Sequence, residues 1–160
     1  MGETTDCGLL RGSSICSELS DAECAILAGV VKRRALKNDE ILIEEDQVDN
    51  CLYVVSSGAL EVCRHTGGDW ISLHVLKSGD LAGELGFIDG QPHSASLRAI
   101  GPTEVFILER AAFESLLPGH PKVIYGVMRT ILRTVHAILR RMNLQYIELS
   151  NYITKQHGRY

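Results

Sequence analysis

The sequence has no long apolar run and no basic, apolar leader at its N-terminus. Its hydrophobic stretches are interrupted by charged residues well before the roughly 20 residues that a membrane-spanning helix needs. It also lacks an excess of positive charge, because 16 Lys and Arg stand against 20 Asp and Glu, giving a net charge of −4. A general nucleic-acid binder normally shows a basic footprint, so this balance argues against one. We predict a soluble chain in the cytoplasm.

Cysteine patterns that bind metal or form a disulfide framework are missing too. The five cysteines lie at positions 7, 16, 24, 51 and 63, and no two form a Cys-x-x-Cys pair. An odd, widely spaced set in a chain without a leader predicts reduced thiols, and zinc-ribbon or thioredoxin-like chemistry has no basis. An oxygen-sensing iron–sulfur site could use such a set, although the gaps are long and irregular.

The length of 160 residues and the 45% hydrophobic content fit one globular domain. The pattern of apolar and turn residues changes twice along the chain. We predict four parts: a mobile segment over residues 1–16, a β-roll with short helices over 17–117, a long helix over 118–150 and a tail over 151–160.

The central part predicts a mainly β fold with flanking helices. A short helix capped by Ser20 or Asp21 comes first. After it, short apolar segments alternate with turn residues every 8–12 positions, which is typical of an antiparallel sandwich or roll. With at most eight strands in about 80 residues, the pattern favours an eight-stranded antiparallel jelly-roll (β-roll) between an N-terminal helix and a long C-terminal helix.

The long helix begins near Pro121, a residue that suits the first helical turn. Its apolar positions alternate in steps of four and three, as in a heptad seam, and only Gln145 interrupts them. The seam predicts a homodimer through this helix, and the alternative is that it covers the roll of its own chain. The arginines on the opposite face are expected to be solvated. The seam consists of Ile124, Met128, Ile131, Val135, Ile138, Met142 and Leu149.

Residues 79–99 form the segment most suggestive of a ligand site. Glycines before Glu84 would let the backbone approach a ligand closely. Residues 85–89 could form one helical turn whose free N–H groups attract an anion, beside a carboxylate that can accept from hydroxyl groups. Ser94 adds a hydroxyl at the start of the next strand. Amides for a phosphate and an acid for a sugar predict a nucleotide-like site.

This segment resembles the phosphate-binding cassette of the cyclic-nucleotide-binding domain, in the superfamily of the catabolite activator protein and the fumarate–nitrate regulator. The resemblance runs from Leu19 to about Leu149 and includes the strand and turn over residues 52–58, the turn over 76–80 and the long helix after Pro121. It implies a roll that holds a cyclic nucleotide, cAMP or cGMP, under a C-terminal helix that closes over the base and often dimerises.

The resemblance also implies roles for particular residues. Glu84 matches the acid that accepts the ribose 2′-hydroxyl, and Gly83 and Leu85 match its flanking backbone contacts. Ser94 and Ala95 match the hydroxyl and amide that touch the cyclic phosphate. A looser placement puts three residues on strands that line the sugar and base pocket, namely Val62, Leu73 and His74.

One position departs from the family pattern. Members that bind cyclic nucleotides usually have an arginine, paired to the phosphate, where this chain has His93. A histidine offers at most one N–H to a given oxygen and is mostly neutral near pH 7. We expect a ligand that binds weakly and more tightly in acid, another ligand, or a vestigial site that serves protein interaction or dimerisation.

Other functions stay open as alternatives. A haem- or redox-sensing module could use the same roll with histidine or cysteine ligands. A cupin-like metalloenzyme would need a close His-x-His pair, which is missing, so we predict no enzyme activity, no cofactor and no bound metal. Residues 150–160 are too few for a helix-turn-helix, so we expect no DNA binding by this chain alone. A sensor of this kind needs a downstream effector protein.

Overall fold

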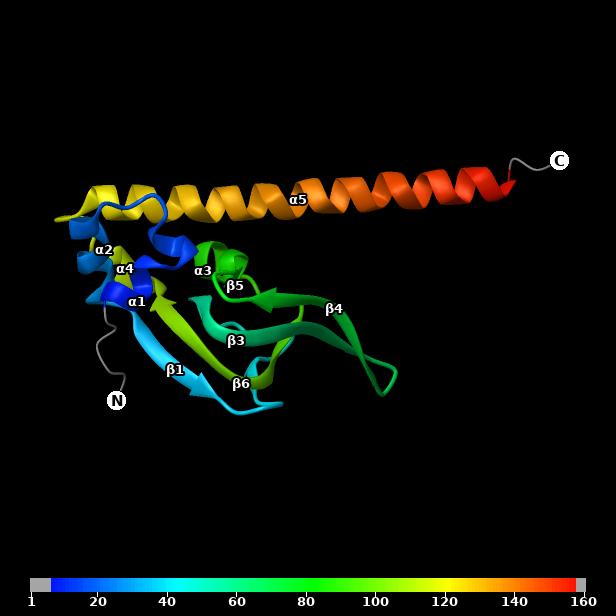
Figure 1. Cartoon of the computed structure of the whole chain (residues 1–160), viewed down its shortest axis with the longest axis horizontal. Helices are drawn as coiled ribbons and strands as arrows, with labels where there is room; N and C mark the ends of the chain where they lie inside the picture. The colour runs from blue at the N-terminus through cyan, green and yellow to red at the C-terminus, as the bar shows by residue number, and fades with distance from the viewer. Residues whose placement is uncertain (1–6, 158–160) are drawn as a thin grey trace.

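The structure is a computed structural model that describes residues 7–157. The first six residues of the predicted mobile segment and the last three of the predicted tail lie outside this range. A sheet is covered at one end by short N-terminal helices, and one long helix runs across the top (Figure 1). The elements are α1 (Cys7–Arg11), a 3-10 turn η1 (Ser14–Cys16), α2 (Asp21–Ala28), β1 (Lys32–Leu36), β2 (Ile41–Ile43), β3 (Cys51–Thr66), β4 (Asp69–Lys77), β5 (Leu81–Ala82), α3 (Glu84–Asp89), β6 (Ser96–Glu109), α4 (Arg110–Glu114) and α5 (Pro121–His157).

The strands pair antiparallel throughout, in the order β1-β6-β3-β4, with β2 on β6 and β5 on β3. The inward side chains form two apolar clusters. One lies inside the roll and includes Leu60, Leu97 and Val105. The other includes Val54 and Phe106, and it joins the end of the roll to the helices. The predicted mainly β fold with flanking helices is therefore confirmed.

The described residues contain six strands where eight were predicted. The difference arises because β3 and β6 each run through a position that reads as a turn in the sequence. At Gly58 the backbone has φ +79°, and the β3–β6 register shifts on both sides of the preceding Ser57, so the chain bulges and continues as one strand. Gly101 has φ +69° within β6 in the same way. The two-residue strand β5 was not predicted.

The N-terminal residues from Cys7 to Cys16 are ordered elements, which corrects the expectation of a mobile segment through residue 16. Leu10 and Ile15 are buried in the helix-side cluster, and this burial fixes α1 and η1. The cap predicted at Ser20 is present as a reciprocal capping box, in which Ser20 Oγ accepts from the Glu23 N–H and the Glu23 carboxylate accepts from the Ser20 N–H.

Two of the five cysteines form a disulfide, contrary to the prediction of reduced thiols. Cys16 and Cys24 are bonded across a Cα–Cα distance of 5.8 Å, while Cys7, Cys51 and Cys63 are free. No spacing in the sequence indicates this pairing, because the two residues come together only when η1 folds back on α2.

Helix α5 begins at Pro121, as predicted, and continues to His157, beyond the predicted end at residue 150. Val123, Val127 and Ile131 are buried against the N-terminal helices. From Leu132 onward no side chain of α5 in the described chain is fully buried, and the helix extends past the roll (Figure 1). Within residues 7–157 no helix combines the length and apolar character that crossing a membrane requires.

Candidate functional site

The predicted cassette folds as strand β5, a glycine turn and helix α3. Gly83 precedes the helix with φ +78°, and a Cβ there would come within 2.8 Å of the Cys51 carbonyl oxygen. Only glycine combines this left-handed conformation with so close an approach to β3. Gly90 ends the helix with φ +67°. The chain thus fixes α3 tightly at both ends.

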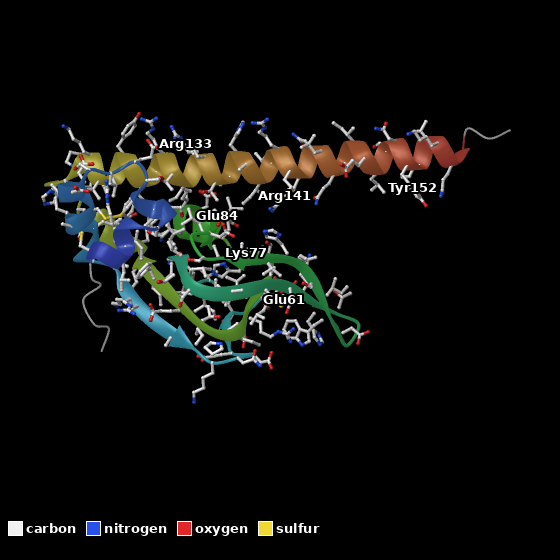
Figure 2. All side chains as sticks on the ribbon, in the orientation of Figure 1. Glu61, Lys77, Glu84, Arg133, Arg141 and Tyr152 are labelled. Atoms are coloured by element: carbon white, nitrogen blue, oxygen red, sulfur yellow. A yellow bond between two sulfur atoms is a disulfide. The ribbon has the colours of Figure 1, made fainter. Side chains whose placement is uncertain are left out.

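Glu84 is the first residue of α3 and lies beneath α5 (Figure 2). Burial raises the pKa of its carboxyl, and its own backbone N–H and the nearby His93 offset part of that rise. No other residue of the described chain is seen to donate a hydrogen bond to this carboxylate. Glu84 is therefore a desolvated acid with unused acceptor capacity.

His93 is buried, with a side chain only 7% exposed, and its Nε2 lies 2.9 Å from Oδ1 of Asp49. The ring packs against α3, since a Cβ at Gly86 would stand 3.1 Å from His93 Cε1. Asp49 Oδ2 accepts a 2.5 Å hydrogen bond from the Tyr53 hydroxyl. Burial, and then this hydrogen bond, raise the pKa of Tyr53. Three side chains thus form one polar network behind the cassette, in which His93 and Tyr53 are buried and Asp49 is exposed to solvent.

The structure brings Gly83, Glu84 and His93 together, and Ser94 and Ala95 follow in the chain. Leu85 is 59% exposed, and Ser94 is exposed as well. None of these exposed groups has a partner that competes with a ligand in the described hydrogen bonds.

Val62, Leu73 and His74, which the resemblance placed less precisely, do not lie together as the cassette residues do. Val62 packs against the roll cluster and is paired with both Leu97 and His74. Leu73 lies at a register shift in β4 and is 55% exposed. His74 is exposed and its Nε2 lies 3.3 Å from Nη1 of Arg141 on α5. Only His74 reaches toward the helix.

A cavity of about 260 Å³ separates the roll from α5. Leu76 and Leu81 line its roll side, and Thr134, Ile138 and Arg141 line its helix side. Arg141 is labelled on the side of α5 that faces the roll (Figure 2). The predicted site residues include none of these helix residues. The seam pattern contains Ile138, but only the packing of α5 shows that this position faces a hollow.

A family model for the cyclic nucleotide-binding domain matches residues 33–120, more than half of the chain. This chain belongs to that family. The resemblance predicted from residues 79–99 is therefore confirmed.

Relatives in the family include regulators. The cyclic AMP receptor protein of Thermus thermophilus is 27% identical over 125 residues, covering 78% of this chain and 58% of that protein. A cAMP-dependent protein kinase regulatory subunit of Yarrowia lipolytica is 28% identical over 110 residues, covering 69% of this chain and 29% of the subunit. The chain thus spans less than two thirds of these relatives.

Solved structures share the fold. A cyclic nucleotide-binding domain from Methylobacillus flagellatus superposes with a TM-score of 0.77 at 24% identity, covering 88% of this chain and 80% of that one. The catabolite activator protein of Thermus thermophilus gives 0.74 at 26% identity, covering 86% and 63%. These likenesses fit the antiparallel roll and long helix of this family member.

A metal centre of the cupin kind would need several His, Cys, Asp or Glu side chains close together. Across residues 7–157, no group of three or more His, Cys, Asp and Glu side chains is placed to hold a metal ion. The disulfide removes Cys16 and Cys24 from the set of available ligands.

Proposed function

We propose that this chain is a non-catalytic regulatory domain that binds a cyclic nucleotide, cAMP or cGMP, between α3 and α5. The observation that carries the proposal is the desolvated Glu84 carboxylate at the family's cassette, facing the underside of α5. A half-buried carboxylate with unused acceptor capacity carries a solvation penalty that a ligand hydroxyl can reduce. The ribose 2′-hydroxyl is such a donor, so Glu84 is assigned to the sugar.

The cyclic phosphate is assigned to the exposed segment that follows His93. Ser94 supplies a hydroxyl and Ala95 a backbone amide there, while Gly83 and Leu85 supply backbone contacts across the turn. A neutral His93 would donate its N–H to the phosphate only after leaving Asp49. We therefore propose a phosphate site weaker than one with arginine, by about 1.5–3 kcal/mol for one charge-assisted contact.

The signal is assigned to α5 because that helix forms one wall of the cavity. A base in the 260 Å³ cavity would contact Leu76 and Leu81 on the roll and Thr134 and Ile138 on the helix. A ligand that contacts both walls stabilises one position of the helix over others. Nucleotide binding would then change what α5 presents to an effector protein.

A homodimer through α5 is part of the proposal, with a seam different from the predicted one. Ile131 is buried and Ile124, Met128, Val135 and Ile138 are partly buried within this chain, so five of the seven predicted seam residues are already covered. Together with Val135, six exposed apolar side chains form a new a/d series whose steps alternate between three and four. These exposed residues are Leu132, Leu139, Met142, Tyr146, Leu149 and Ile153.

Calorimetric titration of the full chain with cAMP and with cGMP, at pH 6 and pH 8, tests the proposal. We expect binding that falls at least about tenfold in Glu84→Gln and rises in His93→Arg. The matched control is Asp89→Asn, an exposed acid at the other end of α3. Absence of heat and of any melting shift with both nucleotides at millimolar concentration would refute the proposed function.

A further inference from the structure

The Asp49 carboxylate is hydrogen-bonded to the ring nitrogen that carries the hydrogen of a neutral His93. Oδ1 of Asp49 lies 2.9 Å from Nε2 of His93, and an ionised carboxylate can only accept. A neutral imidazole has one N–H, so its Nδ1 is then an acceptor. A phosphate oxygen is also an acceptor. In this arrangement a neutral His93 has no hydrogen to offer to a phosphate.

Asp49 is itself held firmly in place. Its Oδ2 accepts from the Tyr53 hydroxyl at 2.5 Å, and its Oδ1 also accepts from the Cys51 N–H at 3.1 Å. On its other side Asp49 lines a second cavity of about 380 Å³, together with the cation Arg110. The carboxylate therefore keeps two hydrogen-bond donors when His93 leaves.

The loop before β3 is joined to the segment around His93 by main-chain bonds as well. The His93 N–H donates to the Gln47 carbonyl at 2.9 Å, and the Asp46 N–H donates to the His93 carbonyl at 2.9 Å. These two bonds do not involve the imidazole, so they can persist while the side chain turns. Only the imidazole must change its partner.

We propose that the Asp49 carboxylate competes with the ligand phosphate for His93. This histidine stands at the position where relatives carry the phosphate-binding arginine. The inference rests on the proposed function. Nucleotide binding exchanges the His93–Asp49 bond for a bond from His93 to the phosphate, and the charge of Asp49 thus sets the affinity for the phosphate part of the ligand.

Asp49→Asn tests this competition by calorimetry with cAMP and with adenosine, which has the base and the ribose diol but no phosphate. The change removes the negative charge and keeps an oxygen for the Cys51 N–H. We expect cAMP to bind about tenfold more tightly to the variant, as expected for one charge-assisted bond. Adenosine affinity should stay the same, which separates competition for the phosphate from a general change of the pocket.

Two controls isolate the effect. Asp46→Asn removes the same charge from the same loop at an exposed residue, and should leave cAMP affinity unchanged. In a His93→Ala background, Asp49→Asn should give no gain, because the competed group is gone. Should Asp49→Asn fail to fold, the imidazole nitrogen shifts of His93 in the wild type must change on saturation with cAMP and not with adenosine.

Unchanged or weaker cAMP binding by Asp49→Asn, with wild-type binding measurable, would overturn the inference and leave the proposed function standing. Weaker binding would show instead that Asp49 supports a charged His93. If neither nucleotide binds the wild type or any variant, the proposed function fails and this inference fails with it. Binding by the variant alone would support both.

Discussion

Replacing Gly58 by alanine should destabilise the roll far more than the same change at Gly101. Both glycines have positive φ, +79° and +69°, so both substitutions force alanine into the left-handed region at about 1 kcal/mol. At Gly58 the new Cβ would also stand 2.5 Å from the Pro102 carbonyl oxygen and 2.9 Å from the Thr103 Cα. At Gly101 it meets nothing within 4 Å.

The backbone contact at Gly58 cannot be relieved by turning a side chain. Thr103 is held there, because its Oγ1 donates to the Ala59 carbonyl at 3.0 Å and accepts from the Ala59 N–H at 3.3 Å. Overpacking adds about 1–3 kcal/mol, for a total of about 2–4 kcal/mol. Urea unfolding should show this loss, with a melting temperature roughly 5–15 °C lower. Gly101→Ala should lose only roughly 2–4 °C, and equal losses in the two variants would refute the reasoning.

Three further predictions concern the buried acid, the disulfide and the helix. Because burial raises the pKa of Glu84 above 4.5, the folded state binds more protons and its stability falls as pH rises from the unfolded pKa through the folded one. Glu84→Gln should therefore raise the melting temperature of the ligand-free protein more at pH 7 than at pH 4, and an equal effect at both would contradict this. Thiol titration of the unfolded chain should find three free cysteines before reduction and five after. Reduction of the Cys16–Cys24 bond should lower the free energy of unfolding by about 2 kcal/mol in urea. Five reactive thiols before reduction would disprove the bond. Leu139→Arg should dissociate the dimer in sedimentation analysis, and a wild type that sediments as a monomer would rule the dimer out.

Local signals predicted the fold well. The cap at Ser20 and the start at Pro121 depend on one or two neighbouring residues, so the sequence displays them directly. The end of α5 was predicted too early, at residue 150, just after the last seam residue Leu149, although no glycine or proline occurs between Gly126 and Gly158. The continuity of β3 through Gly58 was not predicted, because a glycine with positive φ occurs in a bulge as well as in a turn.

The candidate site was predictable where the residues are consecutive and not where they meet through folding. Gly83 and Glu84 are neighbours in the chain, and their order carries the resemblance. Asp49 is separated from His93 by 44 residues, so no spacing links them before the loop folds back. The helix residues of the cavity were missed because the face that α5 turns toward the roll depends on how its first turns pack.

Gly126 determines how the far end of α5 can move. A Cβ there would stand less than van der Waals distance from the buried Leu19, so the helix rests on that side chain as on a pivot. From Gly126 to His157 the helix extends about 47 Å at 1.5 Å per residue. A tilt of about 10° about the pivot would carry its tip roughly 8 Å. Small adjustments near the roll are thereby amplified into displacements large enough for another molecule to detect.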